Sequence, residues 1–91
     1  MDRFEKGMLV RSKAGHDAGE IFIITGTEDA YVYLADGRLR TLQKPKKKKK
    51  KHVQPTRYWD QKVTEAIESS RPTVDEEIRL FIKNWKKERE I

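Results

Sequence analysis

The fold of this chain is decided by residues 8–24, which read MLVRSKAGHDAGEIFII. Residues 8–13 begin with apolar side chains and stop at Ala14-Gly15, as expected of a short strand. After a loop with two glycines four positions apart, residues 21–25 supply a β-branched run that Gly26 closes. This stretch therefore predicts two strands joined by a glycine-containing loop.

The sequence that follows predicts more β structure. Tyr31–Ala35 is expected to be a third strand. Asp36-Gly37 is a two-residue connection typical of a type I′ hairpin turn, so residues 38–42 are expected to form a fourth strand. Residues 52–54 are expected to be a short final strand. Five short strands in about 55 residues are too few for a sandwich and favour a small, strongly bent barrel.

Beyond residue 55 the apolar side chains recur at helical spacing. A first helix is expected over about residues 57–69, with Trp59 on its apolar face. A second helix is expected over residues 73–90, with Thr73 as N-cap and Glu76 completing a capping box. Both tryptophans of the chain fall on apolar stripes and are expected to be core anchors. The stripe of the second helix consists of Val74, Ile78, Phe81, Ile82 and Trp85.

Residues 8–24 resemble a KOW motif, in which a strand, a loop with glycines four apart and a second hydrophobic strand follow one another. KOW motifs are found in SH3-like barrels of ribosomal large-subunit proteins and NusG-type transcription factors. The chain is most similar to the small KOW-domain RNA-binding proteins related to a ribosomal large-subunit family, and the resemblance extends as far as Lys51-His52. It implies a small SH3-like (KOW) β-barrel of about five strands over residues 1–55, which includes a lysine-rich loop at 44–52, followed by a helical extension over 56–91.

The resemblance also implies a role for the loop within the motif. Gly15 and Gly19 match the two glycines of the motif, and the loop between them would lie against RNA. Glycine admits positive φ and lets the backbone approach a phosphate closely, so that free N–H groups of the loop can donate to it. The position after Gly19, commonly a lysine in such motifs, is Glu20 here, and Asp17 adds a second carboxylate. Phosphate contact is therefore expected mainly from the lysines.

The excess positive charge of the chain is concentrated in one place. Residues 44–52 hold seven lysines and no acidic residue, the segments on either side are nearly neutral, and the net charge is +6. A charge block of this kind indicates a polyanion as partner. Lysine is a compact point charge without the planar fork of arginine, so these side chains suit backbone phosphates and do not read bases.

We therefore expect an RNA-binding protein that docks on the phosphate backbone by electrostatic contact, and the resemblance implies ribosomal RNA. Tyr31 and Tyr33 share one strand face and are candidates for stacking on unpaired bases. A ribosomal or transcription protein is a further candidate partner, through the C-terminal helices. The residues expected to contact RNA are Lys13, Gly15, His16, Gly19, Arg38, Arg40, Lys44, Lys46, Lys47, Lys48, Lys49, Lys50, Lys51 and His52.

Other interpretations of the lysine tract remain open at the level of sequence. The tract could be a solvated loop that aids solubility, a membrane-surface patch that attracts anionic lipid, or a nuclear-import signal. The chain could also be a protein-interaction adaptor that uses the barrel face or the apolar stripe of the second helix. In that case the lysines would add only solubility.

Composition disfavours several other classes of protein. The 91 residues include no cysteine and two isolated histidines, so no metal, cofactor or catalytic residue is expected and the chain is not expected to be an enzyme. The longest apolar run, residues 21–24, is too short for a signal peptide or a membrane span. Absence of cysteine suits a reducing compartment, and a cytoplasmic protein is expected.

Overall fold

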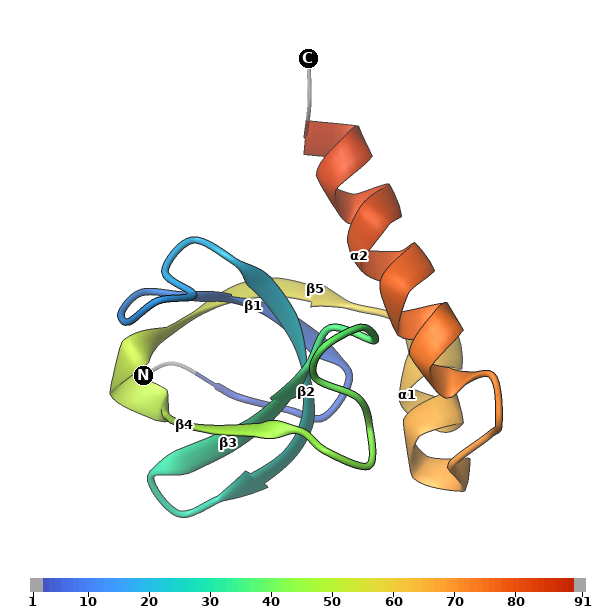
Figure 1. The fold of residues 1–91 in the computed structure, drawn as a ribbon, viewed down its shortest axis with the longest axis horizontal. Helices are drawn as coiled ribbons and strands as arrows, with labels where there is room; N and C mark the ends of the chain where they lie inside the picture. The colour runs from blue at the N-terminus through green and yellow to red at the C-terminus, as the bar shows by residue number, and fades with distance from the viewer. Residues whose placement is uncertain (1–2, 90–91) are drawn as a thin grey trace.

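The computed structural model describes residues 3–89, which form a five-stranded antiparallel sheet with two helices on one side (Figure 1). The strand order is β4-β3-β2-β1-β5. These elements confirm the expected β-rich domain with two C-terminal helices. Residues 1, 2, 90 and 91 lie outside the described residues. The predicted barrel included residues 1 and 2, the predicted second helix included residue 90, and the predicted helical extension included residues 90 and 91. The elements are β1 (Met8–Ser12), β2 (Ile21–Glu28), β3 (Tyr31–Ala35), β4 (Lys46–Lys49), the short 3-10 helix η1 (Lys50–His52), β5 (Val53–Trp59), α1 (Gln61–Ser69) and α2 (Val74–Arg89).

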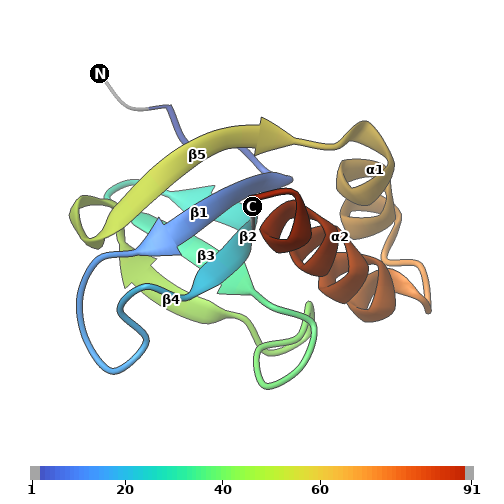
Figure 2. The ribbon, with the colours of Figure 1, turned by 90° about the horizontal axis from the view of Figure 1, so that it is seen from above.

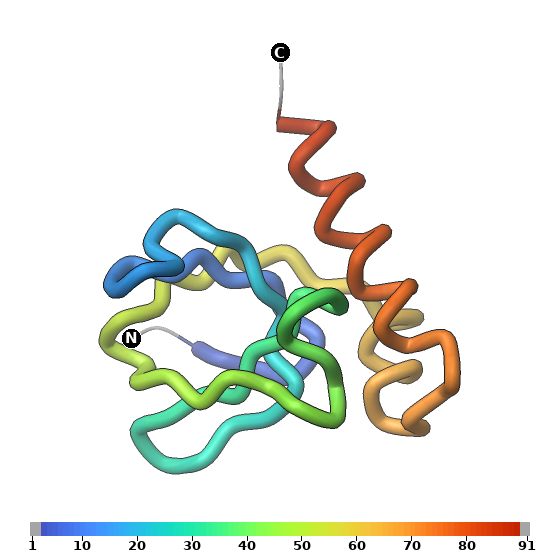
Figure 3. The backbone as a smooth tube through the Cα atoms, viewed as in Figure 1, coloured from blue at the N-terminus to red at the C-terminus, as the bar shows by residue number. Residues whose placement is uncertain are grey.

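The sheet is strongly curved, but within residues 3–89 it is not closed by backbone pairing. β4 and β5 are its two edges, and no ladder joins them. η1 connects these edges in sequence, and the chain turns from β4 into β5 at one end of the curved sheet (Figure 3). A backbone hydrogen bond of 2.8 Å from Lys13 to the carbonyl of His52 ties η1 to the end of β1.

Apolar side chains cover both faces of the central strands, which accounts for the continuous apolar runs in β1 and β2. The helices therefore pack on the sheet and do not extend freely from it (Figure 2). The cluster on the concave face comprises Met8, Val10, Phe22, Ile24, Val32, Leu34 and Val53. The cluster between sheet and helices comprises Leu9, Ile21, Ile23, Ala35, Val63, Ala66, Ile67, Val74, Ile78, Ile82 and Trp85.

The first helix begins later than predicted. Residues 57–59, expected to open it, instead end β5, where Trp59 lies opposite Met8 beyond a register shift. Asp60 then caps α1, and its carboxylate accepts a hydrogen bond of 3.2 Å from the backbone three residues on. Trp59 is consequently 51% exposed and is not the predicted core anchor, whereas Trp85 of α2 is buried as predicted.

α2 agrees with the predicted second helix, but its start is stabilised differently. The Thr73 hydroxyl donates to the Glu77 carboxylate at 2.9 Å, and the predicted capping box with Glu76 is not among the hydrogen bonds of the described residues. Three acidic side chains in the first turn and three basic ones in the last turn match the helix dipole. Charge at the two ends therefore supports this helix.

The predicted fourth strand over residues 38–42 is wrong, because this segment forms a tight loop. The carboxylate of Asp36 accepts hydrogen bonds from the backbone of Arg38 at 2.8 Å and of Arg40 at 3.0 Å. Hydrogen bonds from a side chain to nearby backbone compete with the ladder of a hairpin. Asp36 therefore closes a loop here where a two-residue hairpin turn was expected.

This loop docks on the start of α2. The backbone N–H of Leu42 donates to the Asp75 carboxylate at 2.9 Å, and the Arg79 guanidinium donates to the carbonyl of Gly37. Gly37 has φ of 81°, and a Cβ at this position would collide with the carbonyl oxygen of Asp75. A glycine is therefore required for the close contact between loop and helix.

The fourth strand is formed by lysines, in a stretch that was expected to be a loop. β4 pairs with β3, with Tyr31 opposite Lys49 and Leu34 opposite Lys46. Lysine has a low β propensity, but the free edge of β3 presents backbone N–H and C=O groups that need partners. Charged side chains on an outermost strand also discourage association between sheet edges. We call residues 46–49 the lysine strand.

Candidate nucleic-acid interface

Strand geometry divides the lysine strand into two sets of side chains. Successive side chains of a strand point to opposite faces. Lys46 and Lys48 are half-buried and reach the loop of residues 15–19, whereas Lys47 and Lys49 are exposed. Lys47 and Lys49 are therefore the more exposed pair of the lysine strand.

The carboxylate of Asp17 holds the inward pair. It accepts hydrogen bonds from Lys48 Nζ at 2.9 Å and from the Ser12 hydroxyl at 2.7 Å, and it also pairs with Lys46. Lys48 Nζ further donates to the carbonyl of Ala14 at 2.8 Å. Burial would raise the pKa of Asp17, but the hydrogen bonds from Lys46, Lys48 and Ser12 outweigh it and hold the pKa well below its usual range.

These contacts reduce the share of the inward lysines in any phosphate binding. The side chains of Lys46 and Lys48 are 28% and 10% exposed. Together with Asp17 they contribute a single net positive charge. Their main role is to fasten the lysine strand to the loop between β1 and β2, which leaves phosphate contact to the other lysines.

The other lysines of the tract are exposed, except Lys50, which is half-buried. Lys47 makes an exposed ion pair of 3.3 Å with Glu28. The hydrogen bond to the Glu28 carboxylate raises the pKa of Lys47. Exposed pairs of this kind contribute little free energy, so a phosphate can replace the carboxylate. Lys50 Nζ lies 6.0 Å from the ring centre of Phe4. The outward lysines are Lys44, Lys47, Lys49 and Lys51, which are exposed, and Lys50, which is half-buried.

Tyr31 and Tyr33 lie on the face of β3 opposite its buried aliphatic side chains, as expected, and both are half-buried. The ammonium group of Lys47 lies 4.5 Å from the centre of the Tyr31 ring. A base could stack on this face of the Tyr31 ring only after Lys47 had moved aside. The ring and the ammonium group therefore form a joint site, in which a phosphate that attracts Lys47 would uncover Tyr31.

The loop between β1 and β2 holds Gly15 and Gly19 at φ of 86° and 90°, a conformation that glycine adopts without steric cost. The backbone N–H groups of Ala18, Gly19 and Glu20 already donate to backbone carbonyls in or beside this loop. These three amides are not free to bind phosphate, which differs from the expectation for the loop. His16 is exposed within it. Any contact of the loop with RNA therefore depends mainly on side chains.

The remaining predicted contacts fall in two places. Lys13 is exposed and lies beside the lysine tract, because its N–H donates to the carbonyl of His52 at 2.8 Å. Arg38 and Arg40 are exposed in the loop that precedes β4, and Arg38 lines a groove beside α2. Arg38 therefore belongs to a different surface.

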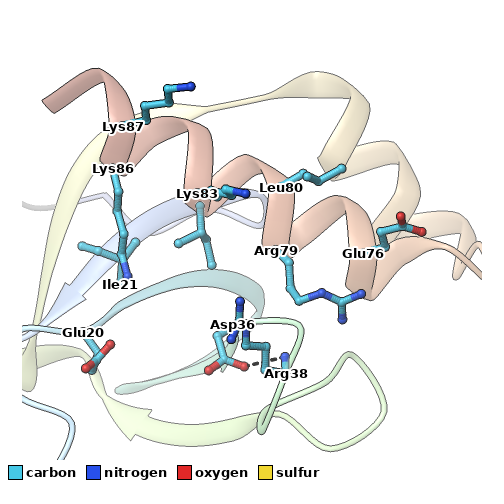
Figure 4. A pocket seen from close by; sticks show the side chains of 11 residues that line it. Glu20, Ile21, Asp36, Arg38, Glu76, Arg79, Leu80, Lys83, Lys86 and Lys87 are labelled. Carbon is cyan, nitrogen blue, oxygen red and sulfur yellow. Dashed lines mark hydrogen bonds between the residues drawn. The ribbon is translucent and has the colours of Figure 1, made fainter. Parts of the chain in front are cut away.

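This groove, of about 880 Å³, lies between α2 and the loop before β4 (Figure 4). Lys83, Lys86 and Lys87 contribute positive charge from α2, and their spacing could have placed them on one helix face from sequence. Sequence analysis missed them as binding candidates. The other charged side chains of the groove are Arg38, Arg79, Glu20, Asp36 and Glu76.

Comparison with known proteins found no protein-family model and no curated protein that matches the chain. Within residues 3–89, no group of three or more His, Cys, Asp or Glu side chains is arranged to hold a metal ion. The same residues contain no helix with the length and apolar character needed to cross a membrane. A functional assignment therefore depends on the charged surface described above.

Proposed function

We propose that this chain is an RNA-binding module that docks on the phosphate backbone of structured RNA through the five outward lysines, which lie in β4, in η1 and just before β4. The observation that carries the proposal is the strand conformation of the lysine tract. Pairing with β3 holds Lys47 and Lys49 on one face, about 6.6 Å apart along the strand. This spacing is comparable to the distance between successive phosphates of a nucleic-acid strand. Because the backbone is already ordered, less conformational entropy is lost on binding.

The chemistry of the surface favours recognition of backbone and shape. Lysines neutralise phosphates without reading base identity, and each contact releases condensed counterions. Unpaired bases that stack on Tyr31, once Lys47 has turned to a phosphate, would add selectivity for single-stranded or looped RNA. The resemblance of residues 8–24 to a KOW motif favours ribosomal RNA as the partner, and the absence of cysteine favours a cytoplasmic setting.

We also propose that the curved sheet is a variant of the SH3-like barrel. The strand order and the curvature of the sheet support this assignment. The pairs that Asp17 forms with Lys46 and Lys48 connect the edge strand β4 to the loop between β1 and β2. These side-chain contacts link β4 to a part of the sheet that is not its neighbour in the strand order.

An adaptor function through the apolar stripe of α2 has less support. Val74, Ile78 and Trp85 are buried against the sheet, so this face is already occupied. Among residues 3–89, the large apolar side chains left exposed for a protein partner are Leu39 at 89%, Trp59 at 51%, Leu80 at 50% and Tyr58 at 42%. A ribosomal or transcription protein bound there would leave the lysine strand available for RNA.

The proposal is tested by removing equal charge from two surfaces. Lys49→Gln/Lys51→Gln neutralises two outward lysines, and Lys6→Gln/Lys62→Gln neutralises two exposed lysines elsewhere. We expect the first variant to bind ribosomal RNA about 25- to 60-fold more weakly at ~0.1 M salt, as the loss of two phosphate contacts predicts. The second variant should bind within about 3-fold of wild type. Equal losses in the two variants would show that net charge alone matters, and would overturn the proposal.

A further inference from the structure

A second, smaller groove lies between the end of α2 and the first two strands. It has a volume of about 270 Å³, and no acidic side chain lines it, in contrast to the larger groove beside it. The two grooves share Ile21 and Lys86, and Lys86 reaches from α2 toward Ile21 (Figure 4). The lining residues are Arg11, Gly19, Ile21, Trp85, Lys86 and Arg89.

Trp85 lines this groove, and its indole Nε1 is a buried hydrogen-bond donor without a partner among the described residues. Trp85 is 8% exposed. Buried polar groups in folded proteins are nearly always paired, so an unpaired one requires an explanation such as an absent ligand. The Arg89 guanidinium lies 5.0 Å from the Trp85 ring and 4.2 Å from that of Tyr58. Contact with the rings orders the guanidinium beside the unpaired donor.

The loop between β1 and β2 connects this groove to the lysine strand. Gly19 lines the groove, and Arg11 Nη1 donates to the carbonyl of Gly19 at 3.3 Å. Asp17 of the same loop holds Lys46 and Lys48. The same loop therefore contacts the inward lysines of β4 and lines the groove.

We propose that the groove receives a backbone phosphate of the RNA that binds the lysine strand, an inference that rests on the function proposed above. Arg11, Lys86 and Arg89 would be its cationic contacts, and Trp85 Nε1 would donate to one of its oxygens. A phosphodiester carries one negative charge and oxygens that accept several hydrogen bonds at once, which matches three cations and one unpaired donor.

The first test measures how the affinity depends on salt. Lys86→Gln/Arg89→Gln removes two of the cations, and Lys6→Gln/Lys62→Gln is the matched control. We expect the slope of log K against log salt to become shallower by about 1.4 to 1.8 in the groove variant, and to change little in the control. A groove variant with the wild-type slope would overturn the inference.

The second test observes the indole N–H groups by NMR. Trp59 Nε1 already donates to the carbonyl of Lys6 at 3.2 Å, and Trp59→Phe identifies its resonance. On addition of RNA we expect the Trp85 indole resonance of the wild type to shift. In Lys86→Gln/Arg89→Gln the shift should be much smaller, even at RNA concentrations that saturate the variant. A Trp85 resonance that does not move in the wild type would also overturn the inference.

The two proposals fail in different ways. If the wild type does not bind RNA, the function proposed above is wrong and the phosphate site is wrong with it. If Lys49→Gln/Lys51→Gln weakens binding while Lys86→Gln/Arg89→Gln matches its control, the lysine strand binds RNA and the groove does not.

Discussion

Lys48 and Asp17 form an ion pair of 2.9 Å across 31 residues of sequence, and this pair joins the edge strand β4 to the loop between β1 and β2. The two side chains are 10% and 14% exposed, so water screens the pair less than it screens a surface salt bridge. Repulsion within a run of lysines opposes strand formation. A carboxylate from a distant part of the chain offsets this repulsion for alternate lysines, which allows the tract to be an ordered strand.

Replacement of Asp17 should therefore destabilise the protein. Asp17→Asn keeps the size of the side chain but leaves Lys48 poorly solvated and without a counter-charge, and we expect a loss of about 1–3 kcal/mol in the free energy of unfolding. Glu28→Gln, which removes the exposed partner of Lys47, is the control and should cost less than about 1 kcal/mol. Urea denaturation of both variants measures the difference. Equal losses would contradict a structural role for Asp17.

The contribution of Asp17 should also depend on pH. The pKa of this carboxyl group is lowered in the folded state, so its stabilising effect is fully present above the unfolded-state value of about 3.9. The effect is lost as the pH falls through that value toward the lower folded-state pKa. The difference in unfolding free energy between wild type and Asp17→Asn should be constant from about pH 7 to pH 5 and then narrow toward pH 2. A difference that does not narrow would show that the carboxylate is not held by the lysines.

Two glycines with positive φ should differ in their tolerance of alanine. Gly37→Ala brings a Cβ into the Asp75 carbonyl and the Arg79 side chain, and should cost about 2–5 kcal/mol. Gly19→Ala meets no atom within 4 Å and carries only the conformational cost, about 1–2 kcal/mol. Thermal unfolding of the two variants compares these costs. If Gly19→Ala is the less stable of the two, the docking of the loop on α2 is described wrongly.

Substitution of one of two neighbouring lysines should lower stability, and substitution of the other should weaken RNA binding. Lys48→Gln should lower the unfolding free energy by about 1–2 kcal/mol, because Asp17 loses a donor, and leave the salt dependence of RNA binding nearly unchanged. Lys49→Gln should make the slope shallower by about 0.7 to 0.9, with stability within about 0.5 kcal/mol of wild type. Denaturation and RNA titration on the same samples test whether inward and outward lysines alternate along the strand. Matching effects from the two variants would exclude a strand in this segment.

Much of the fold could be predicted from the sequence, since β1, β2, β3 and α2 are encoded in local apolar patterns. The lysine strand could not be predicted, because its conformation comes from the free edge of β3 and from Asp17, both distant in sequence. Asp36-Gly37 misled for a related reason: Asp36 uses its carboxylate to close a loop, and Gly37 is needed for contact with α2. Trp59 fits a helical stripe equally well, and only its pairing opposite Met8 places it in β5.

The candidate site could be predicted in composition but not in detail. Charge alone pointed to residues 44–52. Which lysines face outward depends on strand register, and the register is set by the pairing of Lys49 with Tyr31. Asp17 was interpreted only as a weakening of phosphate contact by the loop, because its two lysine partners lie far along the chain. The basic side chains at the end of α2 match the helix dipole, and nothing in the sequence shows that Arg11 lies beside them.

The salt dependence of the affinity for ribosomal RNA tests the central claim most directly. If the five outward lysines contact phosphates, log K against log salt should fall with a slope of −3.5 or steeper, because each contact contributes about −0.7 to −0.9. A slope near zero, or no detectable binding at low salt, would contradict the claim that an ordered strand of lysines binds the backbone of RNA.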